Sequence, residues 1–290
     1  MYLNSLGHHK GTASTFNFQL LTLPMAVALP TLPTHRYSVL HRWHLLSLDA
    51  PTVAVVWTLA AARITHHTLS WYVPGAMFVA VWLVYVADRL LDYKQGEELE
   101  ARHRFHGRFR RRFVIAAMIA LPALLALMWK MPARALLAYI LLCAPLVLYF
   151  AAIHKTRFRQ KAPKEAVVGI FFAAAVFLPE FFTPRVAIAT TFFALLCWLN
   201  CVAIYRWENP QSSDWSARNF RPLVLILAAV CALTPFSPAP HPFAILNLCT
   251  ASSALLLLAL DCTRRPISSV TLRAAADAAL LTPLVLFFLR

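Results

Sequence analysis

The chain has 290 residues, of which 60% are hydrophobic and only 13% are charged, and its formal net charge is +15. A soluble domain carries about a quarter charged residues, so this composition excludes an ordinary soluble globular protein. A basic balance also occurs in nucleic-acid-binding proteins, but here the basic residues lie between long apolar stretches. The composition therefore indicates an integral membrane protein and no nucleic-acid partner.

Residues 1–44 have a mixed composition. They contain an apolar run, residues 16–32, that Pro24 and Pro30 interrupt. The run could serve as a signal peptide or a short anchor, but no strong small-residue cleavage site follows it. We expect residues 1–44 to form a cytoplasmic or interfacial extension that precedes a membrane domain over residues 45–290.

The rest of the sequence is a series of apolar stretches, several of them longer than the ~18 residues that mark a membrane span. The stretches are continuously apolar, whereas the strands of a membrane barrel alternate over about ten residues, so they predict helices. We expect an all-α polytopic membrane protein with about nine transmembrane helices, and no fewer than about seven. The predicted spans are residues 47–65, 71–92, 113–129, 134–153, 165–182, 186–207, 221–236, 242–261 and 271–289.

Charge predicts the orientation of these helices. With the amino terminus in the cytoplasm, most of the 27 lysines and arginines fall on the cytoplasmic side, including the basic loops 94–112 and 154–164. This asymmetry is the positive-inside pattern. It places the carboxyl terminus outside, and we expect the plasma (inner) membrane to be the location.

Two acids, Asp88 and Asp92, end the second predicted helix. They are four residues apart, so they share one helix face and lie about 6 Å apart along the axis. A carboxylate within a span is costly, which makes it a candidate functional residue. The alternative is simple pairing, of Asp88 with Arg89 or another helix's base and of Asp92 with Lys94, and the spacing alone favours neither.

Asn200 and Glu208 end the sixth predicted helix on the same predicted side of the membrane. They are eight residues apart, two turns, and so share a face. Oxygen ligands at that depth suit Mg²⁺, which binds through one or two carboxylates plus substrate phosphates. Alternatively, Asn200 forms an interhelical hydrogen bond and Glu208 is an interfacial acid.

The loop after the fourth helix is basic and includes Lys155 and Arg157, which suit either a phosphate group or anionic lipid. Two further acids have simple structural interpretations. Asp49, next to a helix start, is expected to cap that helix. Asp277 follows Arg273 by one turn and either pairs with it or belongs to a site near the cytoplasmic face.

This layout resembles the UbiA superfamily of intramembrane prenyltransferases, whose first motif is NxxxDxxxD. The aligned stretch here is Val84-xxx-Asp88-xxx-Asp92, in which Val84 replaces the family's Asn. The segment from Tyr149 to Gly169, with Lys155 and Arg157 between them, is similar to the family's Tyr…Lys-Arg…Gly stretch. Nine helices and an acidic end to helices 2 and 6 complete the resemblance, which covers about residues 45–290.

The second family motif, DxxxD or a relative, corresponds to Asn200-xxx-Ile204-xxx-Glu208, which keeps the spacing and loses most of the charge. The resemblance implies a helical bundle around a central cavity. It implies that Asp88, Asp92 and Glu208 are catalytic and bind Mg²⁺. It further implies a diphosphate site formed by the residues Lys155, Arg157, Arg89 and Asn200.

The implied reaction is Mg²⁺-dependent transfer of a prenyl group from a polyprenyl diphosphate to a hydrophobic acceptor, either aromatic or lipid. Metal and basic residues stabilise the leaving diphosphate in such a reaction. The two motifs retain only three carboxylates, so a diverged, non-catalytic relative that binds a lipid or a partner is the alternative. A transporter is a third possibility, although the chain has only six glycines and no evident repeat.

Overall fold

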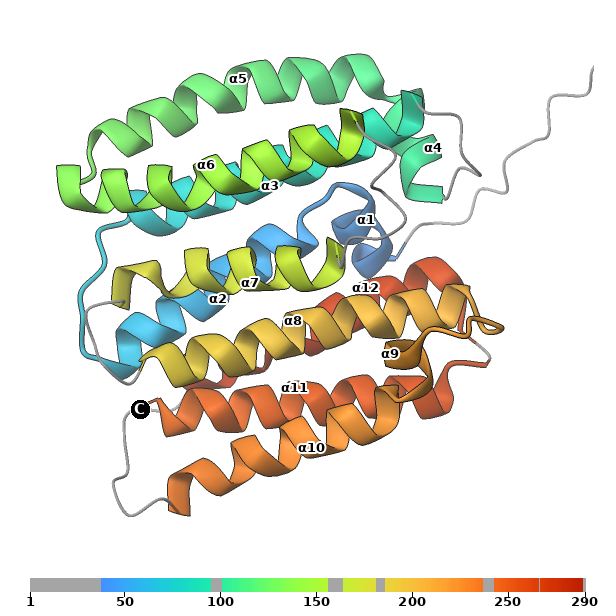
Figure 1. Cartoon of the computed structure of the whole chain (residues 1–290). Coiled ribbons are helices and arrows are strands. Elements are labelled where there is room, and N and C mark those ends of the chain that lie inside the picture. The colour runs from blue at the N-terminus through green and yellow to red at the C-terminus, as the bar shows by residue number, and fades with distance from the viewer. Residues whose placement is uncertain are drawn as a thin grey trace, which may run out of the picture. The chain divides into compact units, whose positions relative to one another are not determined.

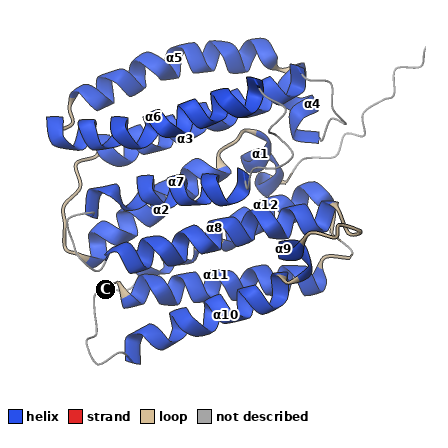
Figure 2. Ribbon diagram, in the orientation of Figure 1, coloured by secondary structure: helices blue, strands red, loops and turns tan. Residues whose placement is uncertain are grey.

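The computed structural model describes residues 38–94, 101–155, 164–180, 186–236, 243–265 and 267–288. The predicted amino-terminal extension lies outside these residues as far as residue 37. Within the described part of the chain every regular element is helical, as Figure 2 shows. The α-helices are α1 (Val39–Leu45), α2 (Asp49–Ile64), α3 (Tyr72–Lys94), α4 (Ala101–Arg108), α5 (Arg110–Trp129), α6 (Ala133–Lys155), α7 (Lys164–Phe177), α8 (Val186–Glu208), α9 (Trp215–Arg218), α10 (Phe220–Leu233), α11 (Ala244–Thr263) and α12 (Ser269–Ala279).

The all-helical prediction is confirmed, and each of the nine predicted spans contains a described helix. Four helices are long and apolar enough to cross a membrane: Tyr72–Leu91 within α3, together with α5, α8 and α11. A fifth span results if α1 and α2 are counted as one bent helix. The structure thus supports a helical membrane protein, while four to five spans, and not nine, meet the criterion of length and composition among the described residues.

The last predicted span, residues 271–289, is not one continuous helix. Helix α12 ends at Ala279, and a short 3-10 helix, η4 (Thr282–Phe287), follows with Pro283 at its start. A backbone carbonyl at the break finds its hydrogen-bond donor within the protein, because Trp57 Nε1 donates to the Leu280 carbonyl at 2.7 Å. Backbone that is not helical is tolerated at membrane depth only where protein surrounds it. The prediction of one continuous helix over residues 271–289 was therefore wrong.

The core lies where α2, α7, α8, α10, α11 and α12 meet, and Figure 1 shows these helices running side by side. An aromatic cluster fills its centre: the ring centroids of Trp57 and Phe193 are 4.2 Å apart, and Phe177 packs edge-on against both. All three side chains are almost fully buried. Such dense packing holds the helices together where water supplies no driving force.

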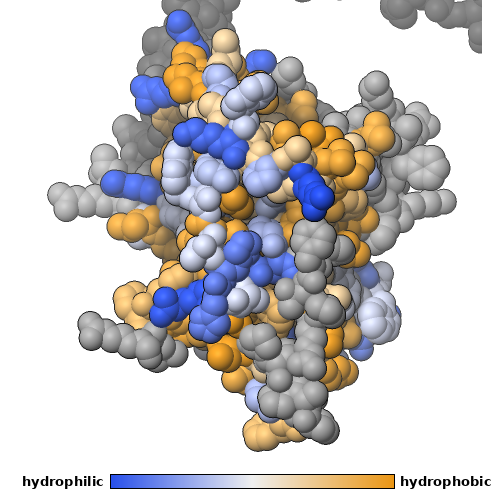
Figure 3. All heavy atoms as spheres, turned by 90° about the vertical axis from the view of Figure 1, so that its left-hand side faces the viewer, coloured by the Kyte–Doolittle hydropathy of each residue, from blue (hydrophilic) through white to orange (hydrophobic). Residues whose placement is uncertain are grey.

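Helix α5 lies at one edge of the bundle in Figure 1, packed mainly on α3, and exposes most of its apolar side chains. Met118, for example, is 70% exposed and Ile119 67%. A continuous apolar face of this kind is stable against lipid and unstable against water. Figure 3 looks onto the end of the bundle opposite to α4 and α9, where hydrophilic residues gather in the middle and hydrophobic residues flank them.

Candidate functional site

Several polar side chains meet at one end of the bundle, where α2 and α12 begin and α3 and α8 end. We call this the site end. Helix α1 crosses it, because the chain bends by 94° between α1 and α2. Ser47 forms the corner with φ 60°, a left-handed conformation. The corner brings the His44 side chain back onto the first residue of α2, so that His44 Nδ1 lies 2.6 Å from Asp49 Oδ2.

Arg89 on α3 joins this corner to the bundle. Its guanidinium donates to the His44 carbonyl at 2.9 Å and to Ser47 Oγ at 2.7 Å. Its Nη2 lies 3.6 Å from Asp49 Oδ2. Arg89 is 3% exposed and Asp49 1% exposed, so the charges of this pair are compensated within the protein. Ser47 Oγ also lies 3.1 Å from His106 Nε2, which connects α4 to the same corner.

Asp277 on α12 completes the group from the other side. Its Oδ2 is 3.7 Å from His44 Nδ1, and its Oδ1 accepts a hydrogen bond from Asn200 Nδ2 at 2.8 Å. Asn200 Oδ1 is buried and has no hydrogen-bond partner. A buried amide oxygen without a partner is costly, so it marks a position where a donor would bind favourably. We call His44, Asp49, Arg89, Asn200 and Asp277 the polar centre.

A cavity of about 40 Å³ adjoins the polar centre. Asn200 and Asp277 line it together with Tyr85 from α3 and Phe172 from α7. Its wall is otherwise apolar. A space of this size holds a few water molecules, and it brings a carboxylate, an amide and two aromatic rings to one point.

Gly169 on α7 also lines the cavity, and its lack of a side chain sets the approach of α7 to α8. A Cβ there would lie 3.1 Å from the Ala194 carbonyl oxygen and 3.2 Å from the Trp198 nitrogen. Both atoms belong to the backbone of α8 and cannot rotate away. The glycine therefore allows the two helices to pack closely beside the cavity.

Glu208 lies further along the same face of α8, as its spacing from Asn200 predicts. Its carboxylate pairs with Arg273 Nε. Because Asn200 contacts Asp277 and Glu208 contacts Arg273, helices α8 and α12 run antiparallel, joined by two polar pairs. The described ion-pair partner of Arg273 is thus on another helix, rather than Asp277 one turn away.

Next to this pair, one buried carboxylate holds several arginines. Asp261 Oδ2 is 2.7 Å from Arg221 Nε, and its Oδ1 is 3.3 Å from Arg206 Nε. Arg264 Nε lies 3.8 Å from the same Oδ1 atom, which also accepts from the Trp207 indole. Three guanidinium groups around one carboxylate leave an excess of positive charge at the ends of α8 and α11.

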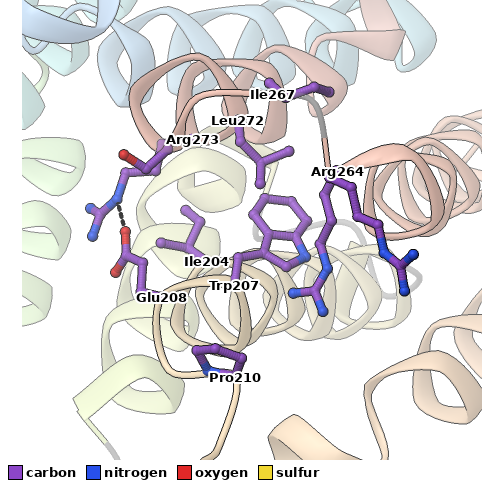
Figure 4. A pocket seen from close by; sticks show the side chains of 10 residues that line it. Ile204, Trp207, Glu208, Pro210, Arg264, Ile267, Leu272 and Arg273 are labelled. Carbon is purple, nitrogen blue, oxygen red and sulfur yellow. Dashed lines mark hydrogen bonds and ion pairs between the residues drawn. The ribbon is translucent and has the colours of Figure 1, made fainter.

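A second and larger cavity, of about 290 Å³, opens between these two groups. Figure 4 shows Trp207, Ile204 and Leu272 in its middle, the Glu208–Arg273 pair on one side and Arg264 on the other. We call it the arginine pocket. Its lining residues are Ile204, Trp207, Glu208, Pro210, Arg264, Arg265, Ile267, Ser269, Leu272 and Arg273.

Of the predicted site residues, Asn200 and Arg89 belong to the polar centre and Glu208 to the arginine pocket. Asp88 is half-buried on α3, one turn beyond Tyr85. Asp92 lies in the last turns of α3, and its side chain is outside the described residues, as are the side chain of Lys155 and all of Arg157. The diphosphate-binding role predicted for Lys155 and Arg157 therefore stays a prediction.

The described donors do not form a Mg²⁺ site as they stand. The ligand atoms of His44, Asp49 and Asp277 lie within 4.8 Å of one another. However, the Arg89 guanidinium is 3.6 Å from Asp49 Oδ2 and would repel a divalent cation. Glu208, a predicted ligand, is paired with Arg273. Among the side-chain oxygens of the polar centre, Asn200 Oδ1 is the buried one without a hydrogen-bond partner.

Reasoning from sequence did not find His44 as a site residue. Its only signal was its place five residues before Asp49, and the 94° corner that joins the two has no clear sequence mark. Comparison with known proteins adds nothing to this geometry, since no protein family, no curated protein and no solved structure matches the chain.

Proposed function

We propose that this chain is an integral membrane enzyme that transfers a prenyl group from a polyprenyl diphosphate to a hydrophobic acceptor, with the site end facing the cytoplasm. One observation carries the proposal. Tyr85, Gly169 and Asn200 come from the three segments that resemble the UbiA superfamily, and all three line the same small cavity. These segments are far apart in sequence, and their meeting at one polar cavity supports a shared role.

The chemistry requires a place for the leaving group and a place for the allylic cation. The described residues offer both. The arginines that surround Asp261 most closely, Arg206 and Arg221, supply the positive charge that a leaving diphosphate needs. The aromatic faces of Tyr85 and Phe172 at the cavity suit an allylic cation.

Asp277 is the described carboxylate on the cavity wall, and in this proposal it is the general base. When the carbon–oxygen bond to the diphosphate breaks, the acceptor attacks the allylic carbon, and Asp277 takes the proton that the acceptor releases. The cavity is too small for a prenyl tail, so the tail must lie beyond it between apolar helices. Mg²⁺ remains an expectation that rests on Asp88 and Asp92, and no step here depends on it.

The test is product formation by the purified full-length protein in lipid nanodiscs, with a panel of polyprenyl diphosphates and aromatic or lipid acceptors. Asp277→Asn removes the base while it keeps an acceptor for Asn200. Its turnover is expected to fall at least a hundredfold, the lower range of a lost general base. Asp214→Asn is the matched control, because Asp214 is an exposed acid that caps α9. Equal turnover of the two variants would contradict the assignment.

A second function has its own observation in its favour. Glu208, Asp49 and Asp261 each have a basic partner in the structure. A diverged relative that binds a lipid and catalyses nothing would use its acids in this way, for stability alone. In that case Asp277→Asn lowers the free energy of unfolding, and neither the wild type nor the control forms product with any donor of the panel.

A further inference from the structure

The arginine pocket stands apart from the small cavity, and its lining combines two chemistries. Trp207, Ile204 and Leu272 form an apolar floor. Arg264 and Arg265 also line it. An apolar surface beside guanidinium groups suits an amphiphile, with a charged head and a hydrocarbon stem, better than it suits a wholly polar solute.

The charge around the pocket is strongly positive. Arg265 forms no hydrogen bond or ion pair with any other described residue. Arg264 reaches Asp261 only at 3.8 Å, and that carboxylate already binds two other arginines more closely. Both guanidinium groups therefore have donors to offer. A planar guanidinium matches a phosphate with two parallel hydrogen bonds.

A helix end strengthens the preference for an anion. Ser269, the first residue of α12, lines the pocket, and the helix is capped by Ser268. The first turn of a helix presents N–H groups and the positive end of the helix dipole. Positive charge from two arginines and from this helix end thus converges on one pocket.

The position of the pocket identifies the source of the anion. Two of the helices that meet the span criterion, α8 and α11, end beside it at Glu208 and Thr263. The end of a span is the depth at which lipid headgroups lie. We infer that the arginine pocket binds the phosphate of an anionic phospholipid, with the start of the lipid's hydrocarbon stem over Trp207. This inference does not depend on the proposed transferase activity.

The test measures dissociation constants for phosphatidylglycerol and phosphatidylcholine by native mass spectrometry of the full-length protein in detergent. The double variant Arg264→Gln/Arg265→Gln is expected to bind phosphatidylglycerol at least tenfold more weakly than the wild type. Arg265→Gln alone is expected to weaken binding at least threefold. It cannot disturb a described contact, so it keeps the test informative if the double variant unfolds.

Arg218→Gln is the matched control, because Arg218 is an exposed arginine at the same end that does not line the pocket. It is expected to stay within twofold of the wild type. An equal loss in Arg218→Gln and the pocket variants would show diffuse surface electrostatics and overturn the inference. Inorganic phosphate that displaces the lipid at equal concentration would overturn the lipid as the source. Equal affinity for phosphatidylcholine would do the same.

Discussion

Arg89 is the side chain whose removal the structure predicts to be most costly at the site end. It is 3% exposed, donates two hydrogen bonds to the α1–α2 corner and faces the buried carboxylate of Asp49. Arg89→Met keeps much of the apolar stem and removes the charge. It removes the arginine from the Asp49 carboxylate, which still contacts His44 Nδ1 and accepts a hydrogen bond from the Ala50 backbone N–H. Removal of one partner of a buried ion pair costs about 3–5 kcal/mol, and we expect a loss in that range.

The assay is reversible unfolding in mixed micelles, with Arg134→Met as the control, since Arg134 is exposed and lies at the start of α6. The double variant with Asp49→Asn isolates the pair. With Arg89 gone, the neutral amide should recover about 1–3 kcal/mol, because no unpaired buried charge remains. The reasoning is refuted if Arg89→Met costs less than about 1 kcal/mol, or if the two substitutions are additive.

Three further predictions concern packing, the second acid and topology. Gly169→Ala places a methyl group 3.1 Å from the Ala194 carbonyl, so the free energy of unfolding is expected to fall by about 1–3 kcal/mol; an unchanged value would contradict the close helix approach. Glu208→Gln is expected to lower product formation at least tenfold in the transfer assay, because one charge of the α8–α12 pair is lost; wild-type turnover would remove Glu208 from the site. Cysteines placed at Gly107 and Lys130 in a chain without its native cysteines are expected to label from opposite sides of the membrane, Gly107 from the cytoplasm, and labelling of both from one side would contradict the topology.

The positions of the main helices could be predicted because apolar run length is a local property. The stretch that became α8, predicted as residues 186–207, is the clearest case, since the helix spans Val186–Glu208. What the runs could not show is where a helix breaks. Helix α12 ends at Ala279, and the freed carbonyl of Leu280 accepts a hydrogen bond from the indole N–H of Trp57 on another helix. Such a partner, more than two hundred residues away, leaves no local pattern.

The candidate site was predictable in part for the same reason. Periodicity placed Asn200 and Glu208 on one face, and both do face α12. The partner of that face was not predictable. Asp277 had two interpretations from sequence, pairing with Arg273 or a place in a site, and its described partners are Asn200 and His44 from other helices. The choice between interpretations depended on tertiary contacts that spacing does not encode.

The most direct test of the central claim is the binding of a polyprenyl diphosphate to the purified full-length protein, measured beside the matching polyprenol, which has the same tail and no phosphate. Each titration is run with Mg²⁺ and with a chelator, so the same experiment tests the expected cofactor. The proposal predicts that the diphosphate binds at least a hundredfold more tightly than the alcohol, because Arg206 and Arg221 beside Asp261 recognise its charge. Equal affinity for the two ligands would show that the protein recognises only the hydrocarbon tail, and it would contradict a diphosphate site at this end of the bundle.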